Sequence, residues 1–351
     1  SAPDEVRALG VDVMVGTADR EAFVLQMEQA AQDKSRHVHW EKVEPSGLPR
    51  AFEQLPAGGL AARTRALLKI EDGCNSFCTY CIIPYARGRV RSMPLEAAVE
   101  ETKKLAQEGY REIVINGIEI SSWGWEWKNG SRLPQLLLAV CEAAPDVRIR
   151  LGSLEPRTID EEFCTMLSGC KNLCPHFHLS LQSGSDTVLK RMNRKYDTAR
   201  YLESVRLLHK HFPNCAVTTD LIVGFPGETE QEFSDSLSFM QTCRLAAVHV
   251  FPYSRRKGTP AASMPDQIEK SEKERRAALA GEVAAELHQT FLTQQIGTEH
   301  DVLFEQTENG YFTGHTMNYV KVYCDAADLR NEIRRVRVTS LFEDGVLAEL
   351  V

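Results

Sequence analysis

Short apolar runs and longer amphipathic stretches alternate along the middle of the chain. The short runs have the length of buried strands, and the longer stretches carry apolar residues at the three- and four-residue spacing of a helix. The pattern predicts six strands, at 67–71, 112–116, 148–152, 177–181, 216–223 and 246–251. It predicts helices in the gaps, at 94–108, 133–143, 160–167, 199–211 and 230–242.

This alternation of strands and helices predicts a parallel sheet, because parallel strands need long crossover connections that are usually helical. A closed TIM barrel is built from eight such units. Since only six are predicted, we expect an α/β fold of the open, partial (β/α)6 TIM type. Its functional site is expected at the carboxyl ends of the strands.

The pattern changes towards the carboxyl end of the chain. A long, charged helix is predicted from 271 to about 295, and five short alternating segments follow Gly297. Such segments predict a small antiparallel β-barrel of the oligonucleotide-binding type. The five segments are 301–305, 310–316, 319–324, 332–340 and 346–350.

The amino-terminal residues do not close a core of their own. They contain one short apolar strand at 11–15 and one helix at 20–32, and a stretch rich in proline, glycine and serine follows. We therefore divide the chain into four parts, namely a fragment at 1–42, a linker at 43–63, a partial barrel at 64–285 and a small β-barrel at 286–351.

Composition narrows the cellular setting. The 351 residues carry a formal net charge of −8, which restricts any nucleic-acid contact to local patches. No apolar run reaches the roughly 18 residues of a membrane span, and the first residues lack the features of a secretory signal. Ten cysteines without framework spacing suit a reducing compartment. We expect a cytoplasmic protein that does not bind membranes.

Three of the ten cysteines lie in one loop after the first predicted strand. Cys74, Cys78 and Cys81 have C-x-x-x-C-x-x-C spacing, and soft thiolates so close together favour zinc, copper(I) or an iron–sulfur cluster. A structural zinc site needs four ligands, and the next downstream thiol is Cys141. A cubane held by three cysteines would leave one iron open for a ligand. A disulfide and a zinc knuckle are the alternatives.

The cysteine loop and several other motifs resemble the radical S-adenosylmethionine (SAM) methylthiotransferase family. An aromatic residue precedes the third cysteine, Ile-Ile-Pro-Tyr-Ala-Arg-Gly-Arg-Val-Arg-Ser follows it at 82–92, and a Tyr-Ser-x-Arg-x-Gly-Thr pattern occurs at 253–259. Motifs of this family cover nearly the whole stretch 64–262. The resemblance implies that the three cysteines bind a 4Fe-4S cluster and that SAM chelates its open iron through its amino and carboxylate groups.

The same resemblance implies which residues surround SAM. They are Tyr80, Gly117, Ser153, Glu155, Gln182, Arg191, Val223, Phe225 and Tyr253, with Asp220 facing the reaction centre as the candidate catalytic residue.

Several of these motifs also have a purely structural interpretation. Gly117 could simply end a strand, and Ser185 with Asp186 could cap a helix. Asp220 could accept a proton or merely cap a turn. A run of cations such as 190–195 is more often a solvated face.

The substrate is inferred from finer similarity. Relatives act on adenosine 37 of tRNA or on an aspartate of a ribosomal protein, and the segment 117–124 most resembles the tRNA subfamily acting on N6-threonylcarbamoyladenosine. That base carries a carboxylate, and the planar guanidinium of arginine suits carboxylates and phosphates. The candidate substrate-binding residues are Arg87, Arg89, Arg255, Arg256 and Arg335.

The carboxyl-terminal segment resembles the TRAM domain of the family, which is an RNA-binding module. Tyr311, Phe312 and Tyr319 are candidates for stacking on bases. However, residues 291–351 contain ten acidic and five basic residues, whereas a phosphate binder is expected to be basic. A plain structural barrel is therefore the alternative.

The resemblance also implies a mechanism and partners. A flavodoxin-type reductant supplies an electron, SAM is cleaved to methionine and a 5′-deoxyadenosyl radical, and the radical activates C2 of the adenine. Sulfur comes from a second, auxiliary 4Fe-4S cluster, methylated by a second SAM. The cysteines of that cluster would lie before Ser1, so this chain does not ligate it. We expect a monomer that binds and cleaves SAM without installing the methylthio group.

Three other functions are compatible with parts of the pattern. They are a ribosomal-protein aspartate methylthiotransferase, an electron carrier with a fourth cluster ligand, and a non-catalytic RNA-binding protein.

Overall fold

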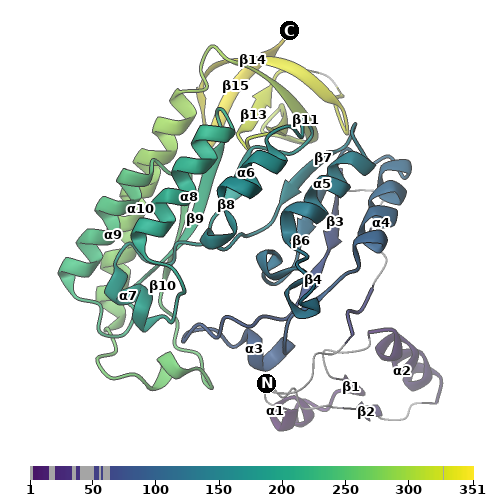
Figure 1. The fold of residues 1–351 in the computed structure, drawn as a ribbon, viewed down its shortest axis with the longest axis vertical. Helices are drawn as coiled ribbons and strands as arrows, with labels where there is room; N and C mark the ends of the chain where they lie inside the picture. The colour runs from purple at the N-terminus through teal and green to yellow at the C-terminus, as the bar shows by residue number, and fades with distance from the viewer. Residues whose placement is uncertain are drawn as a thin grey trace.

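Six parallel strands form the wall of an open barrel in a computed structural model of the chain (Figure 1). The structure describes residues 3–15, 20–33, 37–39, 51–54, 57, 64–326 and 328–351. One three-stranded sheet consists of β3 (Arg65–Lys69), β6 (Glu112–Asn116) and β7 (Arg148–Leu151), and a second consists of β8 (His176–His178), β9 (Ala216–Val223) and β10 (Ala247–Pro252). Single bridges from Ile149 to Leu173 and from Leu154 to Leu179 join the two sheets. The predicted partial barrel of six strands is confirmed.

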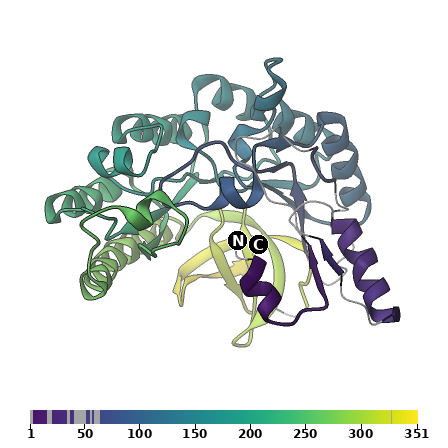
Figure 2. The same cartoon turned by 90° about the horizontal axis from the view of Figure 1, so that it is seen from below.

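Helices cover the outer face of the strands as an arc (Figure 2). They are α4 (Leu95–Gln107), α5 (Leu133–Ala143), α6 (Glu161–Leu167), α8 (Thr198–His211) and α9 (Glu230–Cys243), which confirms the five predicted helices. Side chains cap the first turn of some of these helices. In α9, Thr229 and Glu232 form a capping box. Two short helices, α3 (Ile83–Arg87) and α7 (Asp186–Arg191), were not predicted. Short 3₁₀ turns complete the connections, η1 (Ile120–Ser122), η2 (Trp125–Trp127), η3 (Pro156–Thr158) and η4 (Pro260–Ser263).

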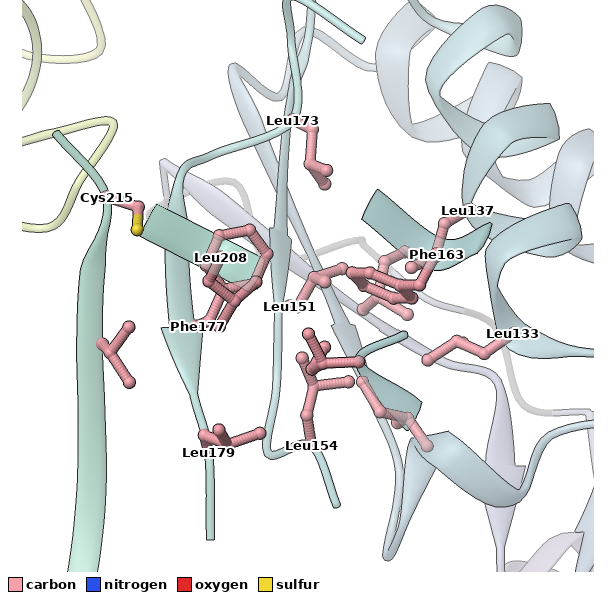
Figure 3. Close-up of a cluster of buried hydrophobic side chains, with 14 of the residues drawn as sticks. Leu133, Leu137, Leu151, Leu154, Phe163, Leu173, Phe177, Leu179, Leu208 and Cys215 are labelled. Carbon is pink, nitrogen blue, oxygen red and sulfur yellow. The ribbon is translucent and has the colours of Figure 1, made fainter. Parts of the chain in front are cut away.

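The main core lies between the sheet and these helices. Figure 3 shows Leu137 and Phe163 from the helices reaching towards Leu151 of β7, while Leu208 lies against Phe177 of β8. All five side chains are buried. Because alternate residues of a strand point to opposite faces, the other face of each strand looks into the barrel interior.

The long helix α10 (Lys270–Thr293) leads to a second, closed barrel. Its strands are β11 (Glu299–Glu308), β12 (Tyr311–Thr316), β13 (Lys321–Cys324), β14 (Ile333–Phe342) and β15 (Gly345–Leu350), in the order β11-β12-β13-β15-β14. The predicted five-stranded barrel is confirmed, although the pairing of β13 with β15 is parallel and not antiparallel.

The closed barrel docks on the amino-terminal ends of the parallel strands, at the opposite end from α3 (Figure 1). Arg148 donates to the carbonyls of Asp301 and His315 at 2.7 and 3.1 Å. The ring of Tyr319 stacks between His176 and His315, at centroid distances of 4.8 and 4.7 Å. These ring contacts help to join the two barrels, and Tyr319 remains 42% exposed.

The amino-terminal elements are α1 (Pro3–Ala8), β1 (Val13–Val15), α2 (Arg20–Asp33) and β2 (His37–His39). They include the predicted short strand and helix. Most of the predicted linker, 43–63, lies outside the described residues. In the part of the chain that the structure describes, no helix is both long and apolar enough to cross a membrane.

Candidate functional site

A small hairpin holds the cysteine loop at the carboxyl end of the first barrel strand. After β3, β4 (Glu71–Asp72) pairs antiparallel with β5 (Arg91–Ser92), and the loop and α3 lie between them. Gly73 has a φ of +88°, and a Cβ there would lie 2.1 Å from the carbonyl oxygen of Arg89. This position therefore requires glycine, which lets the chain turn sharply into Cys74.

The loop is anchored by the segment that follows α7. The amide of Thr79 donates to the carbonyl of Met192 at 3.0 Å, and the side chain of Asn193 donates to the carbonyl of Phe77 at 2.9 Å. On its other side, the Ala261 amide donates to the carbonyl of Thr79 at 2.9 Å. The conformation of the cysteine loop thus depends on two distant motifs of the sequence.

The three motif cysteines line one cavity of about 150 Å³. Tyr80, Ser153 and Glu155, all predicted to bind SAM, line the same cavity, so six predicted residues converge at the carboxyl ends of the strands. Two further charged side chains, Glu119 and Arg194, also line it. The remaining lining residues are Ser76, Ile83, Ile118, Leu154 and Ser180.

The thiols lie in an environment that disfavours a free thiolate. Burial raises the pKa of Cys74 to about 11, and it also raises the pKa of Cys81. The guanidinium of Arg194 partly compensates, with Nη1 at 3.2 Å from Sγ of Cys78. Such a site needs additional positive charge before all three sulfurs can ionise.

The donor set fits a cluster better than a single metal ion. All ten cysteines are free thiols, and no three His, Cys, Asp or Glu side chains among the described residues are close enough together to hold one ion. A cubane does not require such a group, because each thiolate binds a different iron. Three thiols around one cavity therefore fit the ligand set of a cubane with one open iron.

Two carboxyl groups face the cavity beside the guanidinium. Burial raises the pKa of Glu119, whose carboxylate accepts hydrogen bonds from the amide of Ser121 and the hydroxyl of Ser122. Glu155 accepts a hydrogen bond from Nε of Arg157 at 2.9 Å. A ligand with both ammonium and carboxylate groups finds opposite charges for both within this cavity.

Glu119 and Arg194 are the two charged lining residues that were not predicted from the sequence. Glu119 ends the Asn-Gly-Ile-Glu segment that pointed to Gly117, and Arg194 belongs to the cationic run 190–195. The position of Glu119 just after the strand that ends at Asn116 could have indicated it. For Arg194, the cationic run 190–195 gave no indication of which side chain faces the cavity.

Three predicted SAM-binding residues lie behind the cavity. Phe225 and Tyr253 pack edge to face at 5.3 Å, and Tyr80 contacts Phe225 at 6.5 Å. Val223 is buried, and its carbonyl accepts a hydrogen bond from the amide of Tyr253 at 2.8 Å. The hydroxyl of Tyr253 is buried without a hydrogen-bond partner among the described residues. These side chains form a firm support for Tyr80.

Gln182 is buried and has a φ of +69°, in the left-handed region that non-glycine residues seldom adopt. Its amide and carbonyl bond to Asp220 and Ile222 of β9. Backbone strain of this kind is often found at functional sites, where the surrounding structure maintains it.

Gly117 is crowded by protein atoms. A Cβ at this position would lie 2.9 Å from Glu71 Oε2 and from a methyl carbon of Ile120. Burial raises the pKa of Glu71 to about 9, and its second oxygen has no partner among the described residues. The absence of a side chain at Gly117 is therefore explained by the packing of a buried, protonated carboxyl group.

Arg191 is committed to contacts outside the cavity. Its guanidinium forms two hydrogen bonds with Glu232, at 2.8 and 2.9 Å, and a third with the carbonyl of Gly227. Arg191 thus ties α7 to α9, and Arg194 is the arginine that lines the cavity.

Asp220 faces the barrel interior from β9. Its Oδ2 lies 3.3 Å from Nε2 of His178 on β8. His178 and Thr218 line a larger interior space of about 940 Å³, so Asp220 lies next to its wall. Ser153 lines this space and the cysteine cavity alike, so the two adjoin.

Four of the predicted substrate-binding arginines lie on segments next to the cysteine loop. Arg87 Nη1 is 3.9 Å from Asp72, and the guanidinium of Arg89 lies 5.0 Å from the ring centre of Phe77. Arg255 donates to the carbonyl of Ala262, and Arg256 is close enough to Cys81 to lower the pKa of that thiol against the larger effect of burial.

Arg335 lies on β14 of the closed barrel, at the other end of the molecule from the cysteine loop (Figure 1). It forms ion pairs with Glu299 and Asp301 at 3.4 and 3.3 Å. The parallel strands separate it from the cysteine cavity by roughly 16 Å or more, at about 3.3 Å per residue.

Comparison with known proteins identifies the family. Residues 68–240 match the model of the radical SAM superfamily. The chain is 37% identical over 347 residues to the threonylcarbamoyladenosine tRNA methylthiotransferase MtaB of Bacillus subtilis (strain 168), covering 96% of this chain and 76% of that protein. It is 37% identical to the MtaB protein of Thermotoga maritima, covering 99% of this chain and 78% of the relative.

A relative named for another base is also similar. The tRNA-2-methylthio-N(6)-dimethylallyladenosine synthase of Acetivibrio thermocellus is 36% identical over 285 residues, covering 79% of this chain and 58% of that protein. The similarity to the MtaB proteins extends over more of the chain. From this similarity and the cysteine cavity described above, the chain belongs to the radical SAM superfamily, within the methylthiotransferase family that contains the MtaB proteins.

Proposed function

We propose that the chain is a methylthiotransferase that converts N6-threonylcarbamoyladenosine at position 37 of tRNA to its 2-methylthio derivative. Two relatives that share 37% identity over nearly the whole chain are named for this base. The observation that carries the proposal is the convergence of three thiols, two carboxyl groups and one guanidinium on a single cavity. The relatives described above do not favour the alternative, a ribosomal-protein aspartate methylthiotransferase.

Membership of the radical SAM superfamily implies a 4Fe-4S cluster and SAM. We propose that Cys74, Cys78 and Cys81 each bind one iron of the cluster and that the fourth iron is open to SAM. When bound, the cluster supplies the electron that cleaves SAM, which starts the reaction at C2 of the adenine.

The side chains around the cavity would bind and orient SAM. Arg194 offers a guanidinium to the SAM carboxylate, and Glu119 and Glu155 offer carboxyl oxygens to its ammonium and ribose hydroxyls. Ser153 can donate to the part of SAM that reaches towards the barrel interior. Tyr80 covers the cavity and is supported from behind by Phe225.

The remaining predicted residues would support this arrangement. We propose that Val223, Tyr253 and Gln182 stabilise the wall near SAM. Gly117 leaves space for the buried side chain of Glu71. Arg191 holds α7 in place and thereby positions the cysteine loop. This distribution is supported by the hydrogen bonds of Arg191 to Glu232 and by the bonds from the loop to the end of α7. Asp220 faces the interior, where the base would react.

We further propose that tRNA lies across the mouth of the cysteine cavity, with Arg87, Arg89, Arg255 and Arg256 near its phosphates. Arg335 would contact a more distant part of the tRNA after giving up its present ion pairs. Electrons would come from a flavodoxin-type reductant. Since its tRNA substrate is cytoplasmic, the protein would act in the cytoplasm, as a monomer.

We propose a second, auxiliary 4Fe-4S cluster as the sulfur source. The seven cysteines beyond the motif are not proposed as its ligands, because six of them are buried, although Cys141 lies within hydrogen-bond reach of Cys170. They are Cys141, Cys164, Cys170, Cys174, Cys215, Cys243 and Cys324.

A substrate comparison tests the function. The protein is reconstituted anaerobically and given SAM and reductant together with an anticodon stem–loop containing threonylcarbamoyladenosine or a ribosomal-protein peptide. We expect the stem–loop to bind and to change the rate of 5′-deoxyadenosine formation, while the peptide has no effect. An effect of the peptide alone would overturn the proposal.

A further inference from the structure

A chamber of about 940 Å³ occupies the barrel interior between the parallel strands and the closed barrel. Leu67 and Val114 form an apolar part of its wall, and Arg150 with the stacked Tyr319 forms its floor. Ser153 lines both this chamber and the cysteine cavity. A molecule that reacts at the cysteine cavity can therefore extend a substituent into the chamber.

The polar side chains of one wall are joined in a column. Nε2 of His178 lies 3.3 Å from the Asp220 carboxylate, so that nitrogen carries the proton. Nδ1 of His178 then accepts from the Thr218 hydroxyl at 3.1 Å, and the Thr218 oxygen in turn accepts from Nε2 of His176 at 3.2 Å. Both nitrogens of His178 are therefore used within the protein.

His249 lies beside this column but outside it. It is on β10, its Cα is the register partner of Asp220, and its ring centre is 6.1 Å from that of His178. Its side chain is exposed to the chamber. Within residues 64–326 and 328–351 it has no hydrogen-bond or ion-pair partner. It is thus an imidazole donor available to a ligand in the chamber.

The charge of the chamber indicates which ligand this donor would receive. Four cationic and two anionic side chains line it, namely Arg65, Arg150, Lys321 and Arg330 against Glu305 and Asp344. Oδ2 of the adjacent Asp220 lies 3.3 Å from Nε2 of His178. Arg65, Arg150 and Lys321 are offset by ion pairs with acidic side chains. The unused imidazole donor of His249 and the guanidinium of Arg330 are therefore the features that suit an anionic group, of which a carboxylate is the common organic example.

The chemistry of the proposed substrate supplies such a group at this place. C2 and C6 of adenine flank the same ring nitrogen, so a base with C2 at the cysteine cavity would have room for its N6 substituent in the adjoining chamber. The threonylcarbamoyl substituent ends in a carboxylate. We infer that His249 is a specificity-determining residue that donates a hydrogen bond to this carboxylate, an inference that rests on the proposed function.

A binding experiment tests this without catalysis. Fluorescently labelled anticodon stem–loops carry adenosine, threonylcarbamoyladenosine, or the same modified base with its carboxylate replaced by a carboxamide. Their dissociation constants are measured for the reconstituted wild-type protein, His249→Leu and His249→Gln. His211→Leu is the matched control, because His211 pairs with Glu161 on the outer face, away from the chamber.

We expect His249→Leu to bind the carboxylate stem–loop about tenfold more weakly, the effect of one hydrogen bond to a charged group. Its affinity for the adenosine and carboxamide stem–loops should stay the same, His249→Gln should restore most of the loss, and the control should match the wild type. Melting temperatures close to that of the wild type would show that the variants are folded, since His249 is exposed on an edge strand.

Two results would overturn the inference, and they differ from failure of the proposed function. If wild type prefers the carboxylate stem–loop and His249→Leu keeps that preference, His249 does not read the carboxylate. An equal loss for the carboxylate and carboxamide loops would have the same meaning. If wild type does not distinguish threonylcarbamoyladenosine from adenosine, the proposed substrate itself is wrong.

Discussion

Replacing Glu112 with glutamine should weaken both the partial barrel and its attachment to the closed barrel. The Glu112 carboxylate is fully buried and bonds Nε and Nη2 of Arg150 at 2.7 and 3.0 Å, with Arg65 at 3.2 Å. Burial by itself would raise the pKa of Glu112, but the arginines hold that pKa below its ordinary value. Arg150 also donates to the carbonyls of Thr316 and Met317 in the closed barrel.

The Glu112→Gln variant keeps the shape of the side chain but leaves the buried guanidinium of Arg150 without its counter-charge, whereas Arg65 keeps its ion pair with Glu305. Breaking a buried ion pair by removing one partner costs about 3–5 kcal/mol. Because glutamine retains one acceptor oxygen, we expect the lower end, about 3 kcal/mol. At roughly 2–4 °C per kcal/mol for a large domain, the melting midpoint should fall by about 6–12 °C.

Urea unfolding followed by tryptophan fluorescence measures the change, because the buried Trp123 reports on the partial barrel. Glu161→Gln is the control, since Glu161 forms only exposed ion pairs, and no measurable change is expected. The double variant Glu112→Leu/Arg150→Met should be less destabilised than the sum of the single variants, because it leaves fewer unpaired charges. An unchanged midpoint for Glu112→Gln would refute this account of the interface.

Three further predictions follow from the same contacts. Arg194→Met should weaken SAM binding at least tenfold by equilibrium dialysis, since a charged hydrogen bond is lost, and an unchanged affinity would remove Arg194 from the site. Burial lowers the pKa of His176 and of His315, so the unfolded chain binds more protons below pH 6.5. The free energy of unfolding should therefore be at its full value above pH 6.5 and decrease below it, by up to about 1.4 kcal/mol per pH unit for each histidine. His176→Phe should reduce this dependence on pH. The same dependence in the variant would contradict the role of His176. Gly184→Ala should cost about 1–3 kcal/mol in urea unfolding, because its Cβ would lie 2.7 Å from Cα of Ser236, and wild-type stability would show that the backbone yields freely.

The periodic parts of the fold could be predicted because they depend on local patterning. The helix α5 begins and ends where its apolar spacing places it, at 133 and 143, and β6 matches its predicted run at 112–116. The helices α3 and α7 are only five and six residues long, too short for a periodicity to be visible. Their existence depends on tertiary contacts, such as the bonds between Arg191 and Glu232.

The choice between Arg191 and Arg194 shows why part of the site could not be predicted. Both belong to one cationic run, and the chain reverses between them at Asn193, which has a left-handed φ of +60°. Arg191 consequently points to α9, and Arg194 points to Cys78. The stacking of Tyr319 on His176 was equally hidden, because these residues are more than a hundred positions apart in the sequence.

Electron paramagnetic resonance of the reconstituted, reduced protein, recorded with and without SAM, tests the central claim most directly. We expect iron and sulfide in equal amounts, a 4Fe-4S signal that changes when SAM is added, and loss of that signal in Cys78→Ala but not in Cys141→Ser. Zinc in place of iron, or a cluster signal that SAM leaves unchanged, would contradict the account.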